Sequence, residues 1–354
     1  MHIRTALFAT AVVASAASPA IAQVDKYSAD AYAKPKYEGY VPPKNGYGQP
    51  DISGVWSNAT TTPFERPAEF KDQLALSEDQ ANRVQGRAET YRRAGNVRTE
   101  AKVGAPEDRN TNLGYNRFWT DPGTQVMRVG GEPRSSLVTT TANGRVPPRK
   151  AGAPPIPRRT SGGADLDESN PMAGPRDNPE ERGLSERCVF FPTGTGPVLR
   201  SVLYNNNYRI SQGKDAVAIW VEMVHDTKII RLNSKHRDDG LRPWMGDSIG
   251  WYEGNTLVVE TTGFPEEQQR AFFNASDDLK VTERFTRVAD NRLLYKFTVE
   301  DPKVWEKPWG GEYEFWASEG IYEYACHEGN YGMYGILAGG RESDRNEAVK
   351  PVKK

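Results

Sequence analysis

The feature that most constrains the fold is a long succession of short strand-like segments in the C-terminal half of the chain. Each segment is rich in β-branched and aromatic residues, and turn-forming groups such as Glu253-Gly254-Asn255 and Asp290-Asn291 separate neighbouring segments. The segments cover residues 198–204, 208–212, 216–224, 228–232, 256–262, 280–288, 293–299, 312–316 and 321–326. Because no helical pattern intervenes, the sequence predicts an all-β fold, either an antiparallel barrel or a sandwich.

The N-terminal half of the chain is predicted to consist of loops with one helix and one hairpin. The whole chain contains 33 glycines and 25 prolines, which indicates much loop or extended structure. Ser77 and Gln80 form a capping-box pattern before a helical run that reaches Arg93. The β-branched residues 136–141 lead to Asn143-Gly144, which predicts a short hairpin. We expect this half to wrap a barrel that resembles a lipocalin-like cup.

The first residues indicate export. His2 and Arg4 precede an apolar run at residues 6–17, and Ala20-Ile21-Ala22 is a small-x-small cleavage pattern. We therefore expect a periplasmic or secreted protein that is cleaved after Ala22. No later run is long and apolar enough to predict a membrane span.

Shifts in composition predict the organisation of the rest of the chain. The predicted regions are a signal peptide at 1–22, an extended arm at 23–50, a wrapping region with the helix and the hairpin at 51–146, a Pro/Gly-rich connection at 147–186, a β-rich domain at 187–340 and a charged tail at 341–354. The formal net charge of −1 gives no electrostatic argument for a nucleic-acid partner or an anionic membrane surface. A small molecule is the expected partner, and the sequence does not indicate an oligomeric state.

The chain has only two cysteines, Cys188 and Cys326. A single pair in an exported protein favours a disulfide, because oxidising compartments disfavour free thiols. The alternative is two separate buried thiols.

Alternation along residues 216–225 predicts that His225 shares a strand face with the apolar residues Val217 and Ile219. The same test places Glu283 on an apolar row with Val281. We interpret His225 and His327 as a candidate base and acid, with Glu283 and Asp226 as orienting carboxylates. The alternatives are a hydrogen-bonded core histidine and a structural salt bridge, in which Arg231, Arg242 or a histidine would pair with Glu283.

Further polar and aromatic residues are candidates for binding a substrate. Arg242 is expected to hold a substrate oxygen, and Trp244 lies among polar residues in a predicted loop, which suits a residue lining a site. The candidate substrate-binding set also includes Arg231, Asp247, Glu323 and Tyr331.

Cofactor motifs are missing from the sequence. No HxH, HExxH or CxxC spacing occurs, and the glycine pairs lack the spacing of a dinucleotide fingerprint or a phosphate loop. We expect neither a metal nor an organic cofactor. A zinc site built from His225, His236 and His327 is the alternative.

Several longer motifs resemble those of a large family of exported bacterial proteins that is common in soil and aquatic bacteria. The motifs are Tyr115-Asn116-Arg117-Phe118-Trp119, Leu184-Ser185-Glu186-Arg187-Cys188, Tyr204-Asn205-Asn206-Asn207-Tyr208, Arg242-Pro243-Trp244-Met245-Gly246-Asp247-Ser248, Trp251-Tyr252-Glu253-Gly254-Asn255-Thr256-Leu257-Val258-Val259-Glu260-Thr261 and Tyr324-Ala325-Cys326-His327-Glu328-Gly329-Asn330-Tyr331. The resemblance covers nearly the whole chain after the signal peptide. It implies export and carries over no activity.

These observations lead to three functional hypotheses. The first is a periplasmic, cofactor-independent acid–base enzyme, a lyase, isomerase or hydrolase, that acts on a small sugar-derived or aromatic natural product. The second is a non-catalytic binding protein for an apolar or aromatic small molecule. The third is a zinc-dependent hydrolase. A cluster of ionisable groups in the cavity would favour the enzyme, whereas an apolar cavity with one polar contact would favour the binding protein.

Overall fold

The structure is a computed structural model that describes residues 37, 39–95, 120–155, 160–161, 164–165, 176–191, 196–270 and 273–348. The predicted signal peptide and most of the predicted arm lie outside the described residues. None of the described helices is both long and apolar enough to span a membrane.

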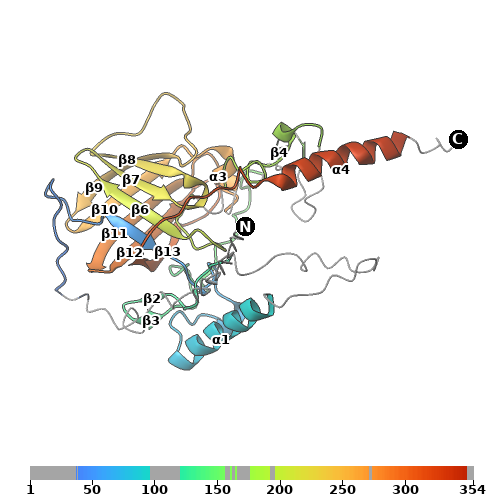
Figure 1. The fold of residues 1–354 in the computed structure, drawn as a ribbon. Helices are drawn as coiled ribbons and strands as arrows, with labels where there is room; N and C mark the ends of the chain where they lie inside the picture. Colours follow the sequence, from blue (N-terminus) through green and yellow to red (C-terminus); the bar gives the residue numbers. More distant parts are fainter. Residues whose placement is uncertain are drawn as a thin grey trace, which may run out of the picture. The chain divides into compact units, whose positions relative to one another are not determined.

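The fold is a closed β-barrel, as the sequence predicts (Figure 1). Around the barrel the strands follow the order β1-β13-β12-β11-β10-β9-β8-β7-β6. The strands are β1 (Gly54–Ser57), β6 (Asn207–Gln212), β7 (Ala216–Val221), β8 (Thr227–Leu232), β9 (Asp247–Glu253), β10 (Thr256–Thr262), β11 (Lys280–Ala289), β12 (Arg292–Glu300) and β13 (Trp309–Ala317). All neighbouring pairs are antiparallel except β8 and β9, which are parallel and are joined by residues 233–246.

Aromatic side chains fill the interior of the barrel. The ring of Tyr295 on β12 lies 5.0 Å from that of Tyr313 on β13 and 5.1 Å from that of Phe285 on β11. Phe64, from the segment after β1, stacks on Phe297 at 5.9 Å. The interior of the barrel is therefore a packed core.

One end of the barrel carries the long connections. Because neighbouring strands are antiparallel, the connections β10–β11 and β12–β13 lie at the same end, where β1 and β7 finish and β6 begins. The short helix α3 (Glu266–Arg270) belongs to the first of these connections. Short turns at residues 213–215, 254–255 and 290–291 join strands at the opposite end.

The capping box at the start of α1 (Glu78–Gly95) is formed as predicted. The backbone N–H of Gln80 donates to Ser77 Oγ at 3.2 Å, and the backbone N–H of Ser77 donates to Gln80 Oε1 at 2.8 Å. The only other helices longer than one short turn in the described part of the chain are α3 and α4 (Tyr331–Ala348).

Two segments that precede residue 150 contact β13. The hairpin of β2 (Arg128–Val129) and β3 (Glu132–Pro133) donates the backbone N–H of Gly130 to Glu314 Oε1 at 2.8 Å. Val138 forms an isolated bridge with Gly311, and a Cβ at Gly311 would overlap the carbonyl oxygen of Leu137. Glycine at this position therefore permits the close approach of the two backbones.

Several predicted elements differ from the observed ones. Residues 198–204 and 321–326 are not strands, whereas β9 and α4 were missed. The predicted hairpin at 136–141 is wrong, since the hairpin lies earlier, although Gly144 does form a turn with Thr141. The connection at 147–186 contains the very short strands β4 (Thr160–Ser161) and β5 (Ala164–Asp165) and the helical turn η5 (Pro179–Glu181). Two further helical turns are η2 (Ala68–Phe70) and η6 (Met223–His225).

Candidate ligand-binding site

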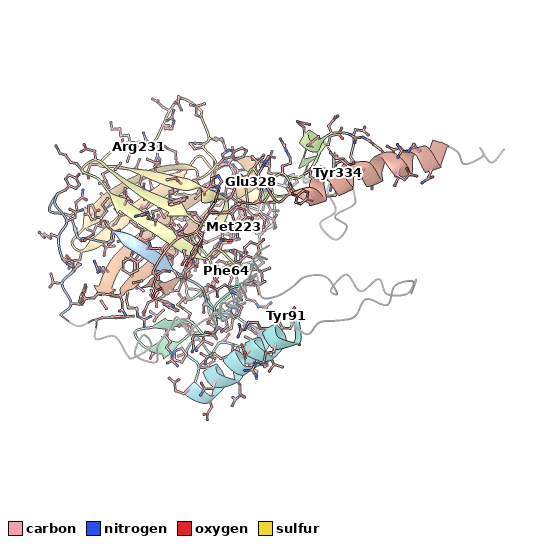
Figure 2. The ribbon with its side chains drawn as sticks, in the orientation of Figure 1. Phe64, Tyr91, Met223, Arg231, Glu328 and Tyr334 are labelled. Atoms are coloured by element: carbon pink, nitrogen blue, oxygen red, sulfur yellow. A yellow bond between two sulfur atoms is a disulfide. The ribbon has the colours of Figure 1, made fainter. Side chains whose placement is uncertain are left out.

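A cavity of about 800 Å³ lies at the loop-bearing end of the barrel. Its wall is built from segments that are far apart in the sequence: residues 60–64 after β1, residues 200–204 before β6, and residues within 88–92 and 120–124. Leu137, Phe191 and Met223 complete the wall. Figure 2 labels three of the lining residues, Phe64, Tyr91 and Met223.

Apolar side chains form most of the cavity wall. Phe64 and Met223 contribute from the barrel side, and Ala88 and Tyr91 contribute from α1. Gly123 has a positive φ of 94°, and a Cβ there would lie 2.6 Å from the carbonyl carbon of Ala59. The absence of a side chain at Gly123 therefore lets residues 120–124 close against the segment that leaves β1.

Arg200 is the charged residue that lines the cavity from the barrel end. Its side chain is partly buried, and its guanidinium carbon lies 5.7 Å from the ring centroid of Phe64. Burial lowers the pKa of Arg200 to about 10, while the nearby phenols of Tyr313 and Tyr208 act in the opposite direction. Arg200 therefore remains a cation at neutral pH.

Five threonines line the same cavity. Thr60 Oγ1 donates to the carbonyl oxygen of Gln125 at 3.0 Å, and Thr62 Oγ1 donates to that of Arg134 at 3.1 Å. The hydroxyls of Thr61 and Thr124 are buried, and neither has a hydrogen-bond partner among the described residues. Both residues line the cavity, but their hydroxyl oxygens are not exposed at its surface.

The backbone beside Arg200 is held by hydroxyl and amide groups from the barrel. The N–H of Leu199 donates to the Tyr295 hydroxyl at 3.1 Å, and Asn58 Nδ2 donates to the Leu199 carbonyl at 3.1 Å. The Tyr313 hydroxyl also donates to that carbonyl, and the Tyr208 hydroxyl donates to the carbonyl of Arg200 at 3.3 Å. These bonds fix the backbone of residues 199–200 at the end of the barrel.

Glu283 lies inside the barrel and not in the cavity wall. It is fully buried and paired with Lys228, and it accepts a hydrogen bond from the Tyr295 hydroxyl at 2.8 Å. Since β8 and β11 are not neighbouring strands, this ion pair crosses the interior. The predicted partners Arg231, Arg242 and histidine are wrong, because Lys228 occupies that role. Burial, and secondarily the charge of Glu283, raises the pKa of Tyr295 well above its usual value.

His225 does not lie on the inward row that alternation predicted. The strand β7 ends at Val221, and the following turn η6 gives Val224 and His225 positive φ angles of 59° and 49°. The side chain of His225 is exposed, whereas Met223 and Val224 are buried. Asp226 follows the turn and is partly buried. The structure therefore separates the side chain of His225 from the buried Glu283.

His327, Glu323 and Tyr331 are also exposed. Their segment is fixed at two points. The predicted disulfide between Cys188 and Cys326 is present, with an S–S distance of 2.03 Å. Upstream of it, the backbone N–H of Tyr322 donates to Glu222 Oε1 at 3.0 Å.

Three further candidates, Arg231, His236 and Asp247, lie together on the outer face of the barrel. Asp247 contacts Arg231 Nη2 at 2.7 Å and His236 Nδ1 at 2.8 Å, and His236 Nε2 lies 3.2 Å from Glu260 Oε1. In the part of the chain that the structure describes, no group of three or more His, Cys, Asp or Glu side chains is placed to hold a metal ion.

Arg242 and Trp244 each contact another residue of the protein. Arg242 Nη1 donates to the carbonyl oxygen of Phe264 at 3.1 Å, and Trp244 stacks on Phe190 with ring centroids 4.9 Å apart. Neither residue is part of the described cavity wall. Sequence reasoning missed Arg200, Thr61 and Thr124, because no motif marks them and only the folded chain brings them together.

No family model, no curated protein and no solved structure matches this chain. The function is therefore inferred from the geometry of the chain itself.

Proposed function

We propose that this protein binds an apolar or aromatic small molecule in the cavity at the loop-bearing end of the barrel, as an exported, non-catalytic binding protein. The observation that carries the proposal is the cavity itself, which has a volume of about 800 Å³ and a mostly apolar wall. Sites for small ligands have volumes of about 300–1,000 Å³ and combine apolar walls with a few polar groups.

The acid–base enzyme that the sequence favoured has less support from the geometry. It requires His225, His327 and Glu283 at one cavity. Glu283 is sealed inside the barrel with Lys228, and both histidines are exposed elsewhere. The zinc-dependent hydrolase likewise requires His236 near the other two histidines, whereas His236 contacts Asp247 and Glu260 on the outer face.

The proposal is tested with N-phenylnaphthylamine, an uncharged apolar dye that becomes fluorescent when it leaves water. Wild-type protein is titrated alongside Ala88→Phe, which adds an aromatic ring to the cavity wall on α1. Ala94→Phe is the matched control, because Ala94 lies on the same helix, is exposed and does not line the cavity.

We expect saturable dye binding to the wild type and to Ala94→Phe, and at least about tenfold weaker binding to Ala88→Phe, equivalent to about 1.4 kcal/mol. Thermal unfolding of each variant establishes that it is folded. No saturable binding to the wild type, or equal binding to the two phenylalanine variants, would contradict the proposed function.

A further inference from the structure

We infer that the disulfide between Cys188 and Cys326 is a redox switch that regulates ligand binding in the cavity. Cys188 lies three residues before Phe191, which lines the cavity. The oxidised protein holds the wall at Phe191 in place, and reduction of the disulfide releases this part of the wall. The inference rests on the proposed function and deepens it, because it names how the same site is regulated.

Residues 183–190 form a compact turn that ends next to Phe191. The backbone N–H groups of Val189 and Phe190 donate to the carbonyl oxygen of Leu184 at 2.9 and 3.4 Å. Because these bonds lie within the turn, it keeps its own shape and shifts as a unit. The position of Phe191 in the cavity wall therefore depends on what attaches the turn to the rest of the protein.

Residues 322–326 attach this turn to the end of the barrel. At one end of the segment, the backbone N–H of Tyr322 donates to Glu222 Oε1 at 3.0 Å. Glu222 is buried and directly precedes Met223, which also lines the cavity. At its other end, the segment forms the disulfide. The disulfide therefore connects two separate parts of the cavity wall through one short segment.

The noncovalent contacts of the turn are weaker than this covalent bridge. Asn330 Nδ2 donates to the carbonyl oxygen of Glu186 at 2.7 Å, and Trp244 stacks on Phe190 with ring centroids 4.9 Å apart. Trp244 is itself 42% exposed and belongs to residues 237–244, which are all exposed. A hydrogen bond of this kind exchanges readily for one with water, so it does not fix the turn as the disulfide does.

The backbone is strained at both ends of this connection. Cys188 has a φ of 56°, and Val224, which follows Met223, has a φ of 59°. This left-handed region is unfavourable for residues with a side chain, above all for β-branched valine. Such conformations persist only where the surrounding structure imposes them. Loss of the disulfide lets Cys188 return to a common backbone conformation, which moves Phe191 out of the cavity wall.

A reductant can reach the disulfide. Cys188 and Cys326 are partly exposed, and their neighbours Val189 and His327 are exposed. A thiolate of a dithiol attacks one sulfur to form a mixed disulfide, and the second thiolate of the dithiol then displaces the protein sulfur. The S–S bond of the protein breaks and two thiols form with two protons from the dithiol, which is oxidised to a disulfide. The partner that opens the switch is therefore a dithiol.

The test measures the affinity of the oxidised and the reduced protein for N-phenylnaphthylamine. The dye is titrated into the wild type before and after treatment with dithiothreitol, and into Cys188→Ser/Cys326→Ser, which mimics the reduced state. Leu257→Ala is the control for lost stability, since Leu257 is buried on β10 and does not line the cavity. Alkylation and mass spectrometry establish the redox state, and circular dichroism establishes that each protein is folded.

We expect the reduced wild type and the double serine variant to bind the dye at least about tenfold more weakly than the oxidised wild type. Reoxidation of the wild type should restore the affinity, and the double serine variant should not respond to dithiothreitol. Oxidised Leu257→Ala should bind the dye as the wild type does. A loss of stability alone therefore does not imitate the expected result.

Equal dye affinity of the oxidised and the reduced wild type, both folded, overturns the inference. Unfolding of the reduced wild type and of the double serine variant at every temperature tested also overturns it, because the disulfide is then required for folding and is not a switch. Failure of the oxidised wild type to bind the dye contradicts the proposed function as well. Dye binding that does not depend on the disulfide contradicts only the redox switch.

Discussion

At the scale of single residues, the most unusual feature is an ion pair inside the barrel. Lys228 and Glu283 are both buried, they come from strands that are not neighbours, and Tyr295 shares the carboxylate. Removing one partner from a buried pair leaves an uncompensated charge, which is more costly than the pair itself.

We therefore expect Lys228→Met to lower the free energy of unfolding by about 3–5 kcal/mol. The double variant Lys228→Met/Glu283→Gln should recover much of this loss, because neither charge then remains in the interior. Unfolding by urea measures both proteins. A single variant as stable as the wild type would mean that the two side chains do not pair.

The raised pKa of Glu314 predicts that the stability of the folded protein depends on pH. It is buried on the outer face of β13, and burial raises its pKa from 4.5 to about 7, against a smaller opposite effect of the Gly130 N–H. The folded state therefore binds the proton more tightly than the unfolded state. The resulting stabilisation is complete below the unfolded value of 4.5 and is lost as the pH rises through about 7.

Glu314→Gln mimics the protonated acid at every pH. Its stability relative to the wild type should increase by up to about 3 kcal/mol between the two ends of this pH range. Urea unfolding across that range provides the measurement. Parallel stability curves for the two proteins would show that Glu314 does not titrate differently in the folded state.

At the scale of secondary structure elements, α1 connects a local sequence signal to the cavity. The capping box of Ser77 and Gln80 fixes its start, and Ala88 and Tyr91 lie further along the same helix in the cavity wall.

Ser77→Ala removes the cap and should lower the free energy of unfolding by about 1 kcal/mol, whereas Ser77→Asp keeps an oxygen acceptor and should retain most of the stability. Thermal and urea unfolding compare the two variants with the wild type. Equal losses in both would show that the cap contributes nothing at this site.

The strands also show which elements could be predicted from the sequence. Strands with regular alternation and clear turns, such as β10, β11 and β12, were found nearly to their ends. β9 was missed because Gly250 interrupts its pattern. A Cβ there would lie 2.7 Å from Ile230 Cγ2, so close packing requires glycine. The prediction for His225 was wrong for a different reason. The alternation of apolar and other residues continues in the sequence after β7 has ended at Val221.

At the scale of the whole molecule, the disulfide joins parts of the chain that are 138 residues apart. Cys188 lies three residues before the cavity residue Phe191, and Cys326 lies in the segment after β13. The barrel and the disulfide could be predicted from the sequence, because strand patterns and a single cysteine pair are local or compositional signals. The cavity could not, since residues 60–64, α1 and residues 200–204 meet only in the folded chain.

The double variant Cys188→Ser/Cys326→Ser should unfold with about 2–5 kcal/mol less stability than the oxidised protein, because the unfolded chain regains the freedom of a long loop. Reduction of the wild type should produce a similar loss. Unfolding of the wild type with and without reductant measures this loss of stability. Equal stability of the wild type in the two conditions would contradict a stabilising disulfide.

The most direct test of the account is a crystal structure of the protein with bound bromonaphthoate, whose bromine is located by anomalous scattering. We predict a bromine peak among the apolar residues near Phe64 and Met223. A bromine peak at another site with an empty cavity, or no bound compound at saturating concentration, would contradict the proposed ligand-binding site.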